Sequence, residues 1–186
     1  MSSEVKGIWF LSLKGHLDRT EGPGAWPALC ERFLEEFQPL VRDPLPSAWY
    51  PEEMLQDQLG LMHGVLSGGD DERYVDLVEQ VAVGGIGRFF RVLLGLGSPR
   101  FAMRQVPTLW ARLRRGAGRC TVDAGPETAV VLIEDFPYLS DRNYQLLQIG
   151  TLRSILTVLK APERRVTIDD GGLDWIRISA HYKPST

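Results

Sequence analysis

Hydrophobic residues in the first two thirds of the chain recur three and four positions apart, the spacing of a helix with one buried face. This spacing predicts helices over residues 26–37, 51–66 and 99–115, and a longer helical stretch that begins at residue 70. Three glycines within residues 84–87 interrupt that stretch. Because glycine costs about 1 kcal/mol in a helix interior, we expect two helices with a break there.

Two segments among these helices have a different pattern. Residues 4–17 alternate unevenly between apolar and polar positions, which fits either a strand that runs into a helix or a helix alone. Residues 39–50 contain three prolines, which remove backbone donors and restrict the residue before them, so we expect an extended connector.

After residue 118 the pattern becomes that of strands. Residues 119–122 and 128–134 alternate and are rich in β-branched side chains, which predicts a hairpin, and residues 165–169 and 173–182 predict a second one. A helix over 144–159 lies between them. Helices followed by strands indicate a single α+β domain over residues 1–186, with an N-terminal helical layer packed on a C-terminal antiparallel sheet.

Composition places the chain among ordinary globular proteins, with 44% hydrophobic and 24% charged residues. Its apolar runs fall well short of the roughly 20 residues that span a bilayer, and its start lacks the features of a secretory signal. We therefore expect a cytoplasmic protein. Cys30 and Cys120 fit neither a disulfide framework nor a zinc site and are expected to be reduced thiols.

Charge is distributed unevenly along the chain. Eight arginines and no lysine or acidic residue lie between Gln80 and Val122, which leaves 13 basic residues against 24 acidic ones elsewhere. Such a segment predicts a patch that docks an acidic protein surface, although a solvated face is the alternative. Nucleic acid is not expected, because aromatic residues do not interleave with the arginines. The predicted docking residues are Arg100, Arg104, Arg112, Arg114, Arg115, Arg119 and, as an apolar anchor, Trp110.

No motif in the sequence predicts catalysis. The histidines lie far apart without a metal-binding spacing, no serine lies in a nucleophile elbow, and no base accompanies either cysteine. We therefore expect a non-enzymatic protein without a metal or a cofactor. The main prediction is a regulatory module that docks a protein. The alternative is a small-molecule sensor with an apolar pocket between helices and sheet, lined by Trp9, Phe89, Phe90 and Phe136, although these aromatics also fit a plain core.

Five short motifs occur along the chain: Val5–Gly7, Pro46–Pro51, Leu94–Pro99, Pro107–Trp110 and Ile133–Pro137. Together they resemble a family of unknown function largely confined to myxobacteria, which looks related to vinyl-reductase-type ligand-binding domains and to core subunits of the TRAPP transport complex. The resemblance covers residues 5–182 and implies helices against an antiparallel sheet, an often dimeric state, and a Ras-like GTPase or signalling protein as a partner. Vinyl-reductase-type domains commonly carry a Cys, Gly, Cys arrangement in the last hairpin, which is missing here.

The same superfamily is similar to the haem nitric-oxide sensors, and one motif of this chain matches a motif of those sensors. Tyr138, Ser140 and Arg142 match their YxSxR pattern for haem propionates, between a predicted strand and a predicted helix. Haem also requires an axial ligand, usually a histidine about 30 residues earlier. Because the window around Leu109 offers no histidine, cysteine or tyrosine, we expect no haem.

Overall fold

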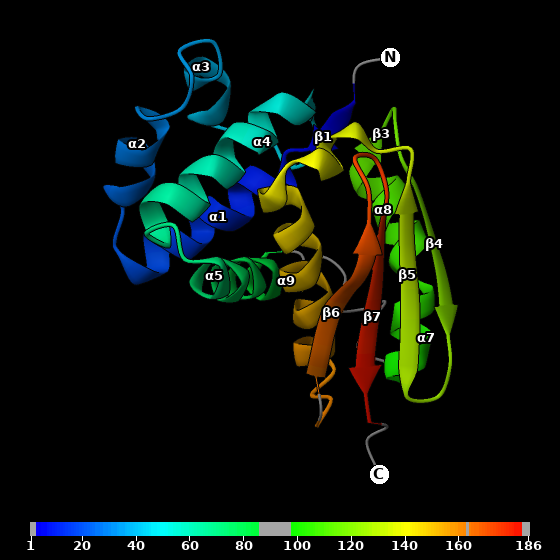
Figure 1. Cartoon of the computed structure of the whole chain (residues 1–186). Helices are drawn as coiled ribbons and strands as arrows, with labels where there is room; N and C mark the ends of the chain where they lie inside the picture. Colours follow the sequence, from blue (N-terminus) through cyan, green and yellow to red (C-terminus); the bar gives the residue numbers. More distant parts are fainter. Residues whose placement is uncertain (1–2, 86–97, 163, 184–186) are drawn as a thin grey trace.

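A four-stranded sheet lies at one end of the molecule and a group of helices at the other, with one long helix between them (Figure 1). The computed structural model describes residues 3–85, 98–162 and 164–183. Among these residues, no helix has the length and the apolar character needed to cross a membrane.

The sheet consists of two hairpins that pair with each other in the order β4-β5-β7-β6, all antiparallel. Its strands are β4 (Arg119–Ala124), β5 (Thr128–Glu134), β6 (Arg164–Gly171) and β7 (Ile176–Tyr182). Alternate residues of β5 are buried, as expected for a strand with one covered face. Both predicted hairpins are therefore confirmed.

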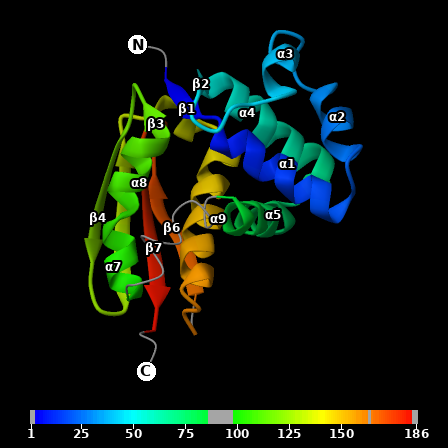
Figure 2. The same ribbon diagram turned by 180° about the vertical axis from the view of Figure 1, so that it is seen from behind.

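Three helices cover one face of this sheet. Helices α7 (Pro99–Arg104) and α8 (Val106–Leu113) pack against β4, and α9 (Arg142–Val158) packs against β6 (Figure 2). The side chains of Ser98 and Asp141 accept hydrogen bonds from backbone N–H groups in the first turns of α7 and α9. The opposite face of the sheet is open in Figure 1.

Helix α9 also contacts the N-terminal helices, chiefly α5 (Asp71–Gly84). The two helices cross closely at Gly150, where an added Cβ would lie 2.5 Å from Val78 Cγ1 and 2.9 Å from the Val75 carbonyl oxygen. Glycine at this position therefore sets how closely the helical layer approaches α9.

The remaining N-terminal elements form the outer part of the helical layer and a small sheet. Residues 4–17 contain a strand that runs into a helix, β1 (Glu4–Lys6) followed by α1 (Ile8–Thr20). Strand β1 pairs on one side with β2 (Trp49–Pro51) and on the other with β3 (Arg114–Arg115). The outer helices are α2 (Ala25–Cys30), α3 (Gln38–Val41), α4 (Glu52–Leu61) and the π-helical turn η1 (Met62–Leu66).

Three predicted boundaries are wrong. The helix predicted over 26–37 ends at Cys30. Phe33 and Phe37 are buried as predicted from their spacing, but they lie in the turns that follow the helix. The connector predicted over 39–50 begins inside the short helix α3. The helix predicted over 99–115 divides at Gln105, and its last two residues form β3. The second half of the stretch predicted from residue 70 lies outside the described residues.

Candidate functional site: an apolar cavity beside a buried arginine

A cavity of about 50 Å³ lies between α8, α9 and the covered face of β4 and β5, with one wall from α1. Most of its surface is aliphatic. The lining residues are Trp9, Val106, Leu109, Trp110, Leu113, Arg114, Cys120, Val131, Ile133, Gln148, Thr151, Leu152, Ser154, Ile155 and Val158.

One stripe of α9 forms a wall of this cavity, because Gln148, Thr151, Ile155 and Val158 follow each other at helical spacing. Two of the polar groups on this wall have partners within the helix. The Gln148 amide donates to the Tyr144 carbonyl at 3.2 Å, and the Ser154 hydroxyl donates to the Thr151 carbonyl at 2.7 Å. The Thr151 hydroxyl is buried and has no partner among the described residues.

Arg114 places a cation at the edge of the cavity. It lies in β3, where pairing with Val5 of β1 fixes its backbone, and only 4% of its side chain is exposed. Its guanidinium carbon lies 4.5 Å from the ring centre of Trp110 and 5.3 Å from that of Trp9, within the range of cation–π attraction. Both indole rings therefore lie close enough to stabilise the buried cation.

The charge of Arg114 is balanced by a buried carboxylate. Arg114 Nε donates to Glu52 Oε1 at 3.2 Å, and the Glu52 side chain is fully buried at the start of α4. The Tyr144 hydroxyl also lies 3.1 Å from Glu52 Oε1. Burial and the neighbouring Glu52 carboxylate raise the pKa of Tyr144, so it remains a neutral hydroxyl.

Three residues in the cavity wall carry a buried polar atom without a hydrogen-bond partner among the described residues. These atoms are Trp9 Nε1, Arg114 Nη2 and Thr151 Oγ1. A buried polar group left without a partner costs about 1–3 kcal/mol, and most buried groups in native proteins are satisfied. Five further atoms of this kind lie elsewhere in the described residues, among them Glu52 Oε2 of the carboxylate that pairs with Arg114, so these atoms do not by themselves indicate a ligand.

Cys120 is the only cysteine in the described cavity wall. Burial raises the pKa of its thiol to about 12, and the nearby Arg114 lowers that value only in part. The thiol therefore stays protonated at neutral pH, which makes it a poor nucleophile and a poor metal ligand. This agrees with the expected reduced thiol.

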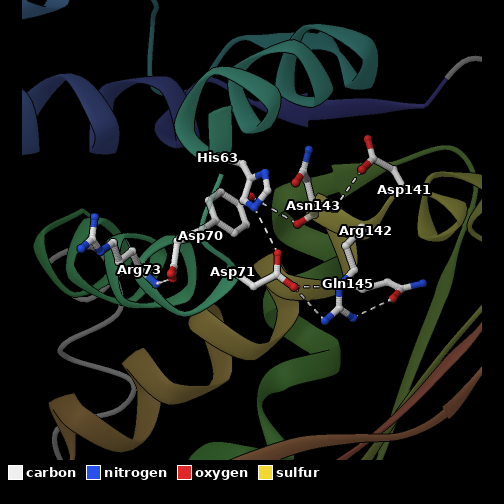
Figure 3. Close-up of polar contacts among 9 residues, drawn as sticks. His63, Asp70, Asp71, Arg73, Asp141, Arg142, Asn143 and Gln145 are labelled. Atoms are coloured by element: carbon white, nitrogen blue, oxygen red, sulfur yellow. Dashed lines mark hydrogen bonds and ion pairs between the residues drawn. The ribbon is translucent and has the colours of Figure 1, made fainter. Parts of the chain in front are cut away.

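The Tyr138–Arg142 motif lies at the other end of α9, and its polar groups already have protein partners. The Tyr138 hydroxyl donates to Glu53 Oε1 at 2.6 Å, and the Ser140 hydroxyl donates to the Pro137 carbonyl at 3.0 Å. Figure 3 shows Arg142 paired with Asp71, which also contacts His63. The motif thus connects α9 to α4, η1 and α5.

Three of the predicted docking arginines pair with acidic residues of this chain. Arg114 is buried against Glu52, Arg115 pairs with Glu4 of β1, and Arg119 pairs with Glu134 of β5. Arg100 donates to the Ala124 carbonyl at 3.0 Å. Arg104 and Arg112 are exposed, and Trp110, predicted as an exposed anchor, is half-buried against Arg114.

Two of the four residues predicted to line a pocket lie at or beside the cavity. Trp9 lines the cavity, and Phe136 is buried next to it, with its ring centre 5.1 Å from that of Trp110. Phe89 and Phe90 lie outside the described residues. Three lining residues were not predicted from the sequence: Gln148, Thr151 and Cys120. For Gln148 and Thr151 the available signal was a polar residue on an otherwise apolar stripe of the helix.

The fold is that of H-NOX domains. The chain is similar to an H-NOX protein from S. oneidensis in the Fe(II) ligation state, with a TM-score of 0.71, 13% identity and 96% of each chain covered. It is also similar to the unliganded Fe(II) H-NOX protein from K. algicida, with a TM-score of 0.64, 12% identity and 96% of each chain covered. An oxygen-binding H-NOX domain related to soluble guanylate cyclases has a TM-score of 0.60 and 12% identity over 95% of this chain and 92% of that one.

No family model and no curated protein matches the chain. The H-NOX likeness contradicts the resemblance to vinyl-reductase-type and TRAPP-type domains, which is wrong even though the α+β class is confirmed. The predicted docking of an acidic partner through arginines is likewise wrong as the main function, since this fold supports the small-molecule alternative better. A Ras-like partner has no support.

The residues that the structure describes do not fit a haem, the group named in one of the matching H-NOX structures. The cavity of about 50 Å³ is far smaller than a tetrapyrrole, and no histidine lies among its described lining residues. His16 is buried on α1, His63 contacts Asp71, and His181 is exposed on β7. The Tyr138, Ser140 and Arg142 side chains, which match a propionate-binding pattern, are already engaged by the protein.

Proposed function

We propose that this chain is a small-molecule sensor that binds its ligand directly in the cavity between α8, α9 and the sheet, without haem. The observation that carries the proposal is the cavity of about 50 Å³, whose wall is mostly apolar with a few polar residues, among them Arg114 and Gln148. Natural ligand sites share this character, since apolar walls supply affinity and a few polar groups supply specificity.

The position of the cavity suits a sensor, because elements from both ends of the molecule meet there. Trp9 brings in α1, Val131 brings in the sheet, and Arg114 connects the cavity to the start of α4 through Glu52. A ligand that changes the position of Arg114 would change its ion pair with Glu52 and, through it, the position of the first turn of α4. Differential contacts of this kind are what allow a ligand to shift a conformational equilibrium.

Xenon gas is a suitable first probe, because it enters small apolar cavities and makes no hydrogen bonds. We expect xenon to shift the methyl NMR signals of residues such as Leu109 and Ile155, which line the cavity. Val131→Leu adds a methylene on the covered face of β5 and should abolish the shifts. Val130→Leu adds the same group on the open face and is the matched control.

Two outcomes would count against the proposal. If xenon leaves the cavity methyl signals of the folded wild type unchanged, the cavity does not admit ligands. If one equivalent of haemin binds and gives a sharp Soret band, the chain binds haem and the proposal of a sensor without haem is wrong. A thermal melt of each variant checks folding, because overpacking a core can cost about 1–3 kcal/mol.

A further inference from the structure

Strand β4 is one edge of the four-stranded sheet, and no described element pairs with its outer side. It forms the outer margin of the sheet in both views of the ribbon (Figure 1, Figure 2). Natural proteins often protect such an edge with a bulge, a proline or a lysine. The other edge strand, β6, has a bulge between Ile168 and Asp170. By contrast, β4 pairs with β5 in a continuous register and contains neither proline nor lysine, so its outer side is open to a further strand.

The hydrogen bonds of the first hairpin show which backbone groups of β4 face outwards. The Gly125 N–H donates to the first carbonyl of β5 at 2.8 Å, and hydrogen-bonded pairs alternate along an antiparallel ladder. The backbone groups of Cys120, Val122 and Ala124 therefore point away from β5. Arg100 Nε of α7 donates to the Ala124 carbonyl at 3.0 Å, which is consistent with an outward carbonyl. Cys120 and Val122 are left with N–H and carbonyl groups that a second strand can pair.

The exposed side chains of β4 are self-complementary about Thr121. Arg119, Thr121 and Asp123 are exposed and, as alternate residues of a strand, lie on the same face of the sheet. The Arg119 side chain pairs with Glu134 at 2.9 Å but is still 63% exposed, and a guanidinium has donors for a second carboxylate. Asp123 lies opposite Val130, and its carboxylate has no partner within the described part of the chain. Opposite charges with capacity for a partner therefore lie two positions before and two positions after Thr121.

We propose that two copies of this chain pair through β4, antiparallel and about a two-fold axis at Thr121, which joins their sheets into one. In this register Cys120 lies opposite Val122 of the second copy, and their outward backbone groups form hydrogen bonds on both sides of the axis. Arg119 lies opposite Asp123 of the second copy, also on both sides. These charged pairs occupy the non-hydrogen-bonded positions, where side chains on neighbouring strands approach most closely.

The charges select this register over its neighbours. An axis at Arg119 or at Asp123 would place like charges directly opposite each other, which destabilises a strand pair. An axis at Cys120 or at Val122 would place both charged side chains opposite uncharged residues. The axis at Thr121 pairs each charge with its opposite. The second copy is therefore a partner of matching chemistry for this edge.

Charge reversals test the pairing by complementation. Arg119→Asp and Asp123→Arg each place like charges opposite each other, so each variant should dimerise at least about tenfold more weakly than wild type in sedimentation velocity. An equimolar mixture of the two variants should dimerise again, because every acid then meets an arginine. Arg165→Asp makes the same change on the bulged edge strand β6 and is the matched control, which should leave dimerisation unchanged.

Amide hydrogen exchange of the wild type identifies the paired strand without any substitution. The N–H groups of Cys120 and Val122 should exchange at least about tenfold more slowly at protein concentrations where the dimer forms than at low concentration, because a second strand covers them. The Thr121 N–H faces β5 and should be protected at both concentrations. Slower exchange in β6 alone would assign the contact to the other edge and overturn the proposal.

The remaining outcomes also decide the matter. If the wild type keeps the mass of one chain, 20.9 kDa, up to about 1 mM, the pairing is refuted. A dimer that persists in both charge-reversal variants, or a mixture of folded variants that stays monomeric, would show that β4 is not the contact. Thermal melts establish folding of each variant. The dimer does not depend on the cavity, so its failure would leave the proposed function unaffected.

Discussion

Removal of the Arg114 side chain should leave Glu52 as an isolated buried carboxylate. The two atoms of the pair lie 3.2 Å apart, and the side chains are 4% and 0% exposed. At an effective dielectric constant of about 20, unit charges at this distance attract each other by about 5 kcal/mol. Breaking a buried pair by removing one partner usually costs about 3–5 kcal/mol, so we expect Arg114→Met to lower the free energy of unfolding by that amount.

The double variant Arg114→Met/Glu52→Met should recover most of the loss. It removes both charges and leaves similar volume, and replacing a whole buried pair by apolar residues is often nearly neutral. Tyr144 keeps a partner in this variant, because its hydroxyl also lies 3.0 Å from the Glu52 backbone carbonyl. Urea unfolding of the two single variants and the double variant at neutral pH measures the coupling.

The exposed pair Arg119–Glu134 provides the control for this experiment. Its side chains are 63% and 33% exposed, so Arg119→Met should cost less than about 1 kcal/mol. If Arg114→Met lowers the free energy of unfolding no more than Arg119→Met does, the Arg114–Glu52 pair contributes little to stability and the reasoning from its burial is wrong. If the double variant is as unstable as the sum of the single variants, the two residues do not act as a pair.

Three further results are expected. Gly150→Ala should lower the free energy of unfolding in urea by about 1–3 kcal/mol, because its Cβ would lie 2.5 Å from Val78 Cγ1. Gly60→Ala, with open space around it, is the control and should be neutral or stabilising, so equal effects of the two substitutions would contradict the close crossing of α5 and α9. In a Cys30→Ser background, Cys120 should resist alkylation by iodoacetamide at pH 8.5 until the protein unfolds, because burial raises the pKa of its thiol to about 12; rapid alkylation of the folded protein would refute this. Because the pKa is higher in the folded protein, the free energy of unfolding should be unaffected by this thiol below the pKa of the unfolded thiol and should fall as pH rises towards 12. Asp71→Asn should change the melting temperature by only a few degrees, because its ion pairs are half exposed; a large loss would show that the motif at the start of α9 is a main structural link.

The H-NOX fold with a poor fit to haem changes the interpretation of the Tyr138–Arg142 motif. Its residue types match the propionate-binding pattern, yet Arg142 contacts Asp71 and Tyr138 contacts Glu53. In this chain the motif joins α9 to α5 and α4. The same residue types therefore stabilise the interface between helices without requiring a cofactor.

The sequence alone determined the features that depend on neighbouring residues. Alternation within 119–122 and 128–134 predicted the first hairpin, because strand pairing across a short turn is local. The side-chain caps at Ser98 and Asp141 are local in the same sense, because a cap acts within three residues. The α+β class followed from the order of these elements.

Only the tertiary structure decided which residues form the site. The charge asymmetry of the arginine segment was visible in the sequence, but Glu52 lies 62 positions from Arg114 and Glu4 lies 111 positions from Arg115. No local pattern identifies such partners. Pairing of β3 with β1 positions Arg114, which is buried close to the indoles of Trp9 and Trp110, and the packing of α9 on the sheet places Thr151 in the cavity wall. Because these contacts join segments far apart in sequence, the fold pairs Arg115 and Arg119 with acidic residues at the surface and buries Arg114 beside a cavity.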